Sequence, residues 1–407
     1  MENVVILSAA RTAVGAYLGT LRTIKPEYLG AYAIEEARKR ADIDKKDVDL
    51  IVLGHVMIDG EARNIARVSG LLAGFDIEVP AYSVDIQCGS GLLAVRDAVM
   101  ELQCGECRVA IAGGTESMSR GIYYLPPNFR YEGFKAGHFT VYDSFVRGSE
   151  CSQPPDLYPN LNMGLTAENV AAHFGITREE QDAFALDSQR KAEAAIKSGR
   201  LKDEIFPVMV PQKKGDPIVF DTDEHPRFGT TMESLSKLKP AFKKDGTGTV
   251  TPGNSSGMND GASAVVLTTE STAQEMGKKP MARILAHQVV GCDPSEMGLG
   301  PVEATRKVLK KAGLELEDMD LIELNEAFAA QSLGVLKELD IGMDTEMYKR
   351  VNVNGGAIAH GHALANSGTR LLTTLIYELK KRHGKYGLAT LCIGGGEGIA
   401  MVIENIE

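Results

Sequence analysis

Two distant stretches of this chain follow the same pattern, and this internal similarity constrains its fold more than any other feature. SGLLAVRDAVMEL at 90–102, followed by VAIAGG, can be laid over SGTRLLTTLIYEL at 367–379, followed by TLCIGGG. A pattern that recurs with its order kept indicates an internal duplication. If the two halves pack as equivalent units, the strand-to-helix turns before these helices lie in related places. Residues near those turns, Cys88 and His362 among them, would then face one cleft.

Strand and helix patterns alternate along the first part of the chain. Residues 4–9 and 48–56 have the short apolar runs typical of strands, and residues 26–41 carry apolar side chains at helical spacing. Further elements follow in the order strand, helix, strand, at 81–87, 89–105 and 107–114. The same alternation returns after residue 271. It predicts an α/β fold in which helices cover mainly parallel strands.

The length of 407 residues is too great for one compact core and suggests more than one domain. Between the similar halves, residues 119–249 carry aromatic and proline-bearing loops and one long amphipathic helix at 177–199. An insertion of this size favours a lid or a substrate-binding module. We therefore divide the chain into an N-terminal half, a loop domain and a C-terminal half, at 1–118 with 250–270, 119–249 and 271–407.

The overall charge argues against several classes of partner. The formal net charge is -11, and no long Lys/Arg run offers a face for nucleic acid. No apolar stretch reaches the roughly 18 residues that a membrane span needs, and no basic segment precedes the first apolar run. Six unevenly spaced cysteines do not resemble a disulfide framework. We expect a soluble cytoplasmic protein without nucleic-acid or membrane partners.

The cysteine pair in CGEC, at 104–107, has a spacing that redox and metal sites use. A zinc site would need two more ligands, and no second CxxC exists. Two thiols at the end of a helix are the simpler interpretation, so we predict no metal site.

Cys88 lies in QCGSGLLAV, where a strand ends, a glycine-rich turn follows and a helix begins. A thiol at a helix N-terminus feels the positive end of the helix dipole, which favours its thiolate. We expect Gly89 and Gly91 to permit a strained turn that presents the sulfur, as nucleophile elbows present serine. The alternative is a small buried cysteine that packs under a helix.

Two histidines, His360 and His362, lie among small residues in NGGAIAHGHALANSG. An activated thiol usually has an imidazole within hydrogen-bond range, so His362 would supply a base if it reaches Cys88. Either histidine could instead be a structural residue. Metal binding is the weakest interpretation, because no third ligand is close in the sequence.

Three further residues are candidates with simple structural alternatives. Asn325 follows the strand DLIEL, and its simplest role would be the N-cap of the next helix. Glu326 would then be an acidic residue in the first turn of that helix, where the helix dipole favours it. Cys392 lies in CIGGGEG, where successive glycines expose backbone amides beside a thiol. Those are the ingredients of an oxyanion hole.

Taken in order, these segments resemble the thiolase family over the whole chain. The matching motifs are QCGSG, GGTESMS, MGLTAENVA, LKPAF, TPGNSSGMNDGA, NEAFAA, NVNGGAIAHGH and CIGGGEG. The resemblance implies a five-layered αβαβα core made of two duplicated halves, plus a loop domain that binds coenzyme A. It also implies a homotetramer (a dimer of dimers) or a homodimer, with acyl-CoA thioesters and CoA as substrates and no other cofactor.

The resemblance also assigns roles to five residues. Cys88 would be the nucleophile that becomes acylated, and His362 the base that activates it. Cys392 would be a second acid/base that moves a proton to or from the substrate's α-carbon. Asn325 would hold a water that forms one oxyanion hole with His362, and the amides of Cys88 and Gly394 would form the other.

Nine further positions match the family's substrate and coenzyme A contacts: Met163, Arg227, Ser234, Leu238, Ala241, Phe242, Ser256, Ala327 and Phe328. Other positions depart from the family pattern, and none of them removes a catalytic group. The departures are Asp85 for Asn, Asn162 for His, His360 for an apolar residue, Ala363 for Pro, Ala365 for Gly, Asn366 for Ala, and Glu397 for a neutral residue.

The resemblance implies an acyl-CoA C-acyltransferase that condenses two acetyl-CoA to acetoacetyl-CoA and CoA, or runs the reverse thiolysis. An acyl-cysteine intermediate would give ping-pong kinetics. One alternative is a degradative 3-ketoacyl-CoA thiolase of longer or broader chain length. From another class, the alternative is a non-catalytic acyl-CoA or lipid-binding protein with the thiolase fold.

Overall fold

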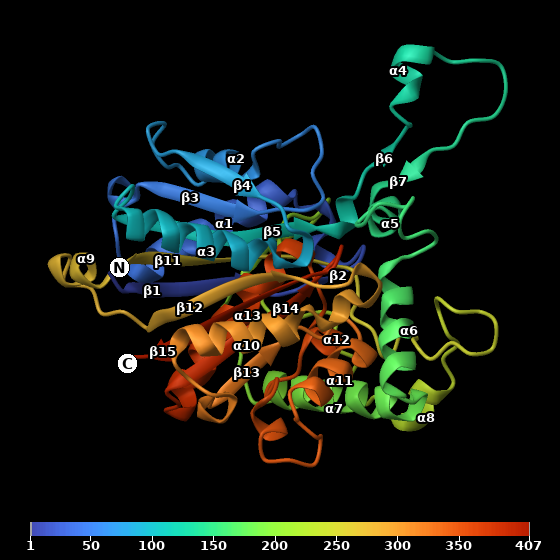
Figure 1. Cartoon of the computed structure of the whole chain (residues 1–407). Coiled ribbons are helices and arrows are strands. Elements are labelled where there is room, and N and C mark those ends of the chain that lie inside the picture. The colour runs from blue at the N-terminus through green and yellow to red at the C-terminus, as the bar shows by residue number, and fades with distance from the viewer. Residues whose placement is uncertain (1, 407) are drawn as a thin grey trace.

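Nine strands of the two halves form one hydrogen-bonded path in the computed structural model, which describes residues 2–406 (Figure 1). Their order is β13-β14-β15-β12-β1-β11-β5-β3-β4. The first half supplies β1 (Val4–Thr12), β3 (Leu50–Gly54), β4 (Ala81–Val84), β5 (Val109–Ser117) and β11 (Asn259–Thr269). The second half supplies β12 (Ala282–Gly291), β13 (Leu321–Leu324), β14 (Tyr386–Ile393) and β15 (Glu397–Asn405).

The strand pairings repeat between the halves. In the first half, β3 runs parallel to β5, β5 antiparallel to β11, and β11 antiparallel to β1. In the second half, β13, β14, β15 and β12 follow the same series of directions. Even the edge strand β4, parallel to β3, has a counterpart, because Val351 bridges Ile322 of β13 in parallel. The duplication predicted from the sequence is confirmed.

Helices fill the space between and outside the strands. The central pair is α3 (Ser90–Cys104) and α13 (Leu364–Arg382), which share one buried core with strands of both halves. Four helices cover the outer faces: α1 (Pro26–Ala41), α2 (Ile65–Leu72), α10 (Gly300–Ala312) and α11 (Ala329–Glu338). The layers therefore run αβαβα, which confirms the expected fold class.

Small residues let the two central helices approach each other closely. A Cβ added at Gly91 would lie 2.3 Å from the carbonyl oxygen of Ala365 and 2.8 Å from Oγ1 of Thr369. A Cβ added at Gly368 would lie 2.6 Å from the amide nitrogen of Leu92. These are the glycines of the two SG pairs that the sequence overlay aligns, so the repeated dipeptide is where the halves meet.

Residues 119–249 form a hairpin arm and a covering layer. The arm carries β6 (Tyr123–Tyr124), α4 (Asn128–Glu132) and β7 (Tyr142–Asp143), and it projects away from the body (Figure 1). The chain then returns through α5 (Ser144–Glu150), α6 (Met163–Phe174), α7 (Arg178–Lys197) and α8 (Met232–Ser236). The long helix predicted at 177–199 is confirmed as α7. The exact domain boundaries stay predictions.

Short elements complete this framework. They are β2 (Gly15–Ala16), β8 (Ile205–Phe206), β9 (Val208–Val210), β10 (Ile218–Phe220), α9 (Glu270–Glu275) and α12 (Ala357–His360). No helix within residues 2–406 has the length and apolar character that a bilayer crossing needs.

The glycine contact between α3 and α13 makes a prediction about stability. Gly91→Ala should lower the free energy of unfolding by about 2 kcal/mol, because its Cβ meets the backbone of α13 and overpacks a rigid contact. Urea unfolding at one protein concentration measures this change. Gly60→Ala is the matched control, since its Cβ has no heavy atom within 4 Å. Equal midpoints for the two variants would contradict the packing argument.

Candidate active site

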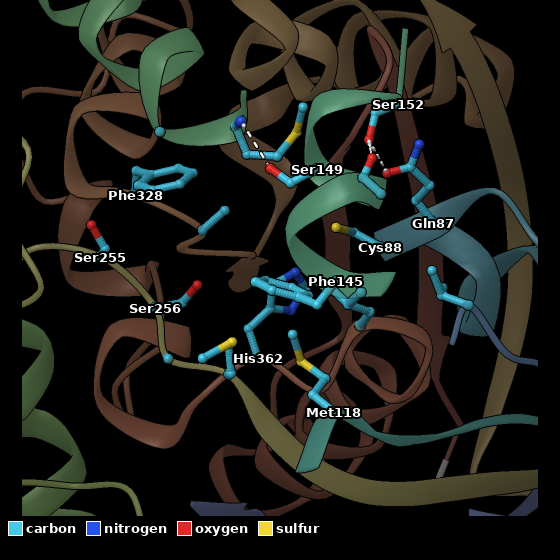
Figure 2. Close-up of a pocket in the computed structure, with 18 of the residues that line it drawn as sticks. Gln87, Cys88, Met118, Phe145, Ser149, Ser152, Ser255, Ser256, Phe328 and His362 are labelled. Carbon is cyan, nitrogen blue, oxygen red and sulfur yellow. Dashed lines mark hydrogen bonds between the residues drawn. The ribbon is translucent and has the colours of Figure 1, made fainter. Parts of the chain in front are cut away.

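A cavity of about 620 Å³ lies where the covering segments meet both halves (Figure 2). Ten of the residues predicted to form the site line it: Cys88, Met163, Arg227, Ala241, Phe242, Ser256, Ala327, Phe328, His362 and Cys392. The two thiols and the imidazole come from the two different halves. The structure therefore brings together the groups that the duplicated turns were expected to place in one cleft.

Cys88 follows a turn whose strained residue is Gln87. Strand β4 ends at Val84, earlier than the predicted residue 87, because Oδ1 of Asp85 accepts the backbone N–H of Gln87 at 2.6 Å. Gln87 then has φ +54, a left-handed conformation that is uncommon for a residue with a Cβ and is often found at functional sites. This turn directs the chain into α3 immediately after Cys88.

The prediction that Gly89 and Gly91 permit the strained turn is wrong. Neither has a positive φ, and both lie where a side chain would collide with the second half. A Cβ at Gly89 would come within 2.5 Å of Ile393. The glycines allow close packing, and the strain falls on Gln87.

The resting thiol is also not the stabilised thiolate that the helix N-terminus suggested. Burial raises the pKa of Cys88 to about 11, although the amide of Gly394 donates toward the sulfur and the amide of Cys88 itself acts in the same direction. Removal from water disfavours the charged form more than these amides favour it. Nearby Glu116 and Asp85 oppose the thiolate further.

His362 is held as one tautomer by its hydrogen bonds. Its Nδ1 lies 2.6 Å from Oγ of Ser367, and that hydroxyl donates its own proton to the carbonyl oxygen of Ala363 at 2.9 Å. Because the hydroxyl has a single proton, it must accept from Nδ1–H. Nε2 is therefore the unprotonated nitrogen, and within residues 2–406 it has no hydrogen-bond partner.

The backbone and the charge state of His362 are both constrained. Its backbone N–H donates to Oδ1 of Asn259 at 2.9 Å. The preceding Gly361 has φ +96, and a Cβ there would collide with the side-chain amide of Asn259. Burial lowers the pKa of His362 to about 4, with a smaller contribution from Arg370. At neutral pH the imidazole is uncharged, as a base must be.

Cys392 lies at the end of β14 and is buried beside Met297 and Ala327. Burial raises its pKa well above the ordinary value, and the neighbouring Cys88 adds to the shift. Gly394 follows two residues later, outside the cavity lining but with its amide directed at the sulfur of Cys88. Both thiols are thus neutral at rest.

Asn325 is not a helix N-cap, so that default interpretation is wrong. Four residues of extended or irregular chain separate β13 from α11, whose N-cap is Phe328. The side chain of Asn325 is fully buried, and neither its oxygen nor its nitrogen has a partner within the described residues. Such atoms cost about 1–3 kcal/mol each when left unpaired, so they usually serve a ligand.

Glu326 has a role that its sequence position did not reveal. Its carboxylate accepts the Ser188 hydroxyl at 2.6 Å, the Asn352 amide at 2.7 Å and the backbone N–H of Ile358 at 3.2 Å. It is buried rather than a solvated acid at a helix start. Glu326 therefore fixes the start of α12, the short helix that leads to His362.

Two predicted coenzyme contacts do not line the cavity. Ser234 is exposed in α8, where its hydroxyl donates to the carbonyl of Thr231 and accepts that residue's N–H. Leu238 packs its side chain against Gly253. Both lie on the segment that leads to Ala241 and Phe242, which do line the cavity.

The departures from the family pattern have structural partners here. Asn162 is the N-cap of α6 and accepts the N–H of Leu165, next to Met163 on the cavity wall. Asn366 accepts the Ser263 hydroxyl at 2.7 Å. Ala365 donates its N–H to Glu116 at 3.2 Å. These residues hold the surroundings of the site without entering its chemistry.

Several cavity residues come from parts of the chain without a recognisable motif. Ser152 on the covering segment donates to Oε1 of Gln87 at 3.0 Å, as Figure 2 shows, and Ser149 accepts the N–H of Met163 at 3.4 Å. Others are Val56, Met57, Phe145 and His225. Nothing in their sequence context distinguishes them from ordinary loop and core residues.

Comparison with known proteins agrees with this geometry. The family model of the thiolase N-terminal domain matches residues 4–271, and that of the thiolase C-terminal domain matches residues 278–405. The chain is similar to a Pseudomonas aeruginosa protein named acetyl-CoA acetyltransferase, with 49% identity over 405 residues and 100% of each chain covered.

Two solved structures share the fold. The crystal structure of the Bacillus anthracis acetyl-CoA acetyltransferase has a TM-score of 0.94 at 42% identity, over 100% of this chain and 99% of that one. The human mitochondrial 3-ketoacyl-CoA thiolase in complex with CoA has a TM-score of 0.92 at 41% identity, over 100% and 98%. The chain therefore belongs to the thiolase family. It is an enzyme of the acyltransferase class.

The neutral resting pair predicts how Cys88 reacts with iodoacetamide. With a thiol pKa of about 11, its alkylation rate should rise roughly tenfold per pH unit between about pH 6 and 9, because the thiolate fraction does. Peptide mass spectrometry follows Cys88 separately, with exposed Cys104 as the internal reference for the reagent. A rate that is constant over this range would show a preformed thiolate–imidazolium pair instead.

Proposed function

We propose that this thiolase is an acetyl-CoA C-acetyltransferase, which joins two acetyl-CoA to give acetoacetyl-CoA and CoA, and catalyses the reverse thiolysis. The observation that carries the proposal is one cavity lined by Cys88, His362 and Cys392, with Nε2 of His362 free to accept a proton. Relatives that carry the name acetyl-CoA acetyltransferase match the entire chain, which supports this activity over the alternatives.

In the first half-reaction, His362 takes the proton of Cys88 as the sulfur attacks the thioester carbon of acetyl-CoA. Because both groups are neutral at rest, proton transfer accompanies the attack and no ion pair has to be desolvated. The amides of Cys88 and Gly394 reach the sulfur, so they are placed to donate to the oxyanion that forms beside it. The carbon–sulfur bond to CoA then breaks, Cys392 gives its proton to the departing CoA thiolate, and an acetyl-cysteine and a Cys392 thiolate remain.

In the second half-reaction, the Cys392 thiolate removes a proton from the methyl group of another acetyl-CoA and becomes a thiol again. Asn325 and His362 support its thioester oxygen, where the negative charge of the enolate collects. The enolate carbon then attacks acetyl-Cys88, the carbon–sulfur bond breaks, His362 returns its proton to the sulfur of Cys88, and acetoacetyl-CoA is released. A raised pKa for Cys392 suits this step, because a weak acid gives a strong conjugate base.

The same proposal assigns substrates and cofactors. Acyl-CoA and CoA enter along the wall that holds Arg227, Phe242 and Phe328, and no cofactor or metal takes part. A solved relative in complex with CoA supports CoA as the ligand. The free cysteines suit the reducing cytoplasm, where we place the enzyme.

A thiolysis assay tests the function. Loss of acetoacetyl-CoA absorbance in the presence of CoA should depend on Cys88, with Cys88→Ala lowering kcat by roughly 10⁴-fold or more, as for other covalent nucleophiles. The acetylated Cys88 peptide should be trapped in parallel. Cys104→Ala, at the exposed end of α3, is the matched control and should keep wild-type rates.

The substrate series separates the alternatives. The proposal expects 3-ketohexanoyl-CoA to react at least about tenfold more slowly than acetoacetyl-CoA, the scale on which pockets discriminate added methylenes. Equal rates would favour a degradative enzyme of broad chain length. CoA binding with neither turnover nor acylation would favour a non-catalytic binding protein.

We further propose a homotetramer. Strand β4 ends the sheet with one side unpaired among the described residues, and exposed edges of this kind pair with second copies. The arm displays Tyr131 at 77% exposure and Phe134 at 68%, too apolar a tip for an isolated surface. Light scattering should give the mass of four chains, and two after residues 127–140 are replaced by a glycine-rich linker. A monomeric mass would contradict both the proposed pairing through β4 and the proposed contact through the arm.

A further inference from the structure

Helix α12 ends at His360, two residues before His362, and it is tied to a distant segment at 223–227. That segment carries His225 and Arg227 on the cavity wall. Two separate side-chain bridges make this connection, and neither is part of the reaction described above.

The first bridge is the imidazole of His360. It is 3% exposed, and its Nε2 is hydrogen-bonded to the carbonyl oxygen of Asn354 at 2.8 Å. Its Nδ1 lies 3.0 Å from Oδ2 of Asp223, close enough for an ion-pair contact but outside hydrogen-bond geometry. Asp223 is itself fixed, because Arg11 reaches both of its oxygens at 2.8 and 3.1 Å and the N–H of Val14 donates to Oδ1. The ring of His360 therefore joins α12 to an immobile carboxylate.

The second bridge is the side-chain amide of Gln189 on α7. Its Nε2 donates to the carbonyl of Ile358 at 3.3 Å, and its Oε1 accepts the backbone N–H of Arg227 at 2.9 Å. Gln189 is 6% exposed. One amide thus joins the first turn of α12 to the residue that faces the coenzyme end of the cavity.

The two bridges act at opposite ends of one helical turn. The carboxylate of Glu326 also holds the start of α12 by accepting the N–H of Ile358. After the end of α12, the chain continues through Gly361 to His362, whose N–H donates to Oδ1 of Asn259. A displacement of the segment at 223–227 therefore moves α12 or breaks a buried hydrogen bond. The segment that faces the coenzyme and the base share one rigid support.

We propose that His360 and Gln189 form a clasp that couples coenzyme A binding at Arg227 to the placement of His362, with His360 as a positioning residue that this chain has in place of an apolar one. The coupling rests on the proposed function for the identity of the ligand. Because the same support holds Arg227 and His362, loss of the clasp weakens coenzyme A binding and slows acyl transfer together.

Kinetics of three variants test the clasp. His360→Ile removes both ring contacts and should raise KM for CoA about threefold or more and lower kcat/KM about tenfold in thiolysis. His360→Gln, whose amide can donate to Asp223 or to the Asn354 carbonyl, should recover part of the loss. Gln189→Leu breaks the other bridge and should reproduce the His360→Ile effect, and it supplies the test if His360→Ile does not fold.

The matched control is Tyr348→Phe. It removes the hydrogen bond from Tyr348 to Asp187, also on α7, without touching the clasp. This control should keep wild-type kinetics. Combining His360→Ile with Gln189→Leu should lower kcat/KM for CoA by more than the product of the single losses, because two restraints act in parallel.

Two results would overturn the clasp. One is wild-type KM and kcat in His360→Ile; the other is an equal loss in Tyr348→Phe, which would reduce the effect to general destabilisation. Titration with CoA distinguishes failure of the clasp from failure of the proposed function. If the wild-type protein binds CoA without turnover, the proposed function is refuted, but a weaker Kd for CoA in the variants would still support the clasp. A wild-type protein that neither binds CoA nor turns over refutes both.

Discussion

The close contact between α3 and α13 is the interaction on which the site depends. Cys88 lies two residues before the start of α3, and His362 lies two residues before the start of α13, so the spacing of these helices sets the separation of thiol and imidazole. Gly91 and Gly368 set that spacing, because any side chain there would meet the backbone of the facing helix. The packing between the two halves therefore also fixes the geometry of the reacting groups.

Burial sets the chemistry at the centre of that contact. The pKa of Cys88 rises and that of His362 falls for the same reason, removal of charge from water, and the pair rests neutral. Among the buried polar atoms that have no partner within the described residues are Nε2 of His362 and the side-chain amide of Asn325, and the proposed reaction uses both. An apolar cavity holding a few unpaired donors and acceptors is well suited to a carbanion that must avoid water.

The sequence was sufficient for the architecture and for the prediction that Cys88, His362 and Cys392 meet in one cavity. A repeated pattern predicts equivalent halves, and equivalent turns predict a shared cleft. The details that failed depend on distances across the chain. A glycine can be required because the backbone has a positive φ or because another segment packs closely against it. The motif QCGSG does not distinguish these two reasons. Helix position favoured a thiolate at Cys88, yet the amount of water excluded decided otherwise. Ser188, which contacts Glu326, and Asp223, which contacts His360, each lie more than 130 residues away in the sequence. No local sequence pattern can show such contacts.

The duplicated architecture has a consequence for what each half can do alone. The first half holds Cys88, the proposed nucleophile, and the second holds the imidazole of His362 and the thiol of Cys392. A single copy of the ancestral unit would carry a thiol without a proton acceptor or an imidazole without a target. In the proposed mechanism, catalysis is therefore a property of the seam between two unequal copies, and the differences between the copies are as necessary to it as their likeness.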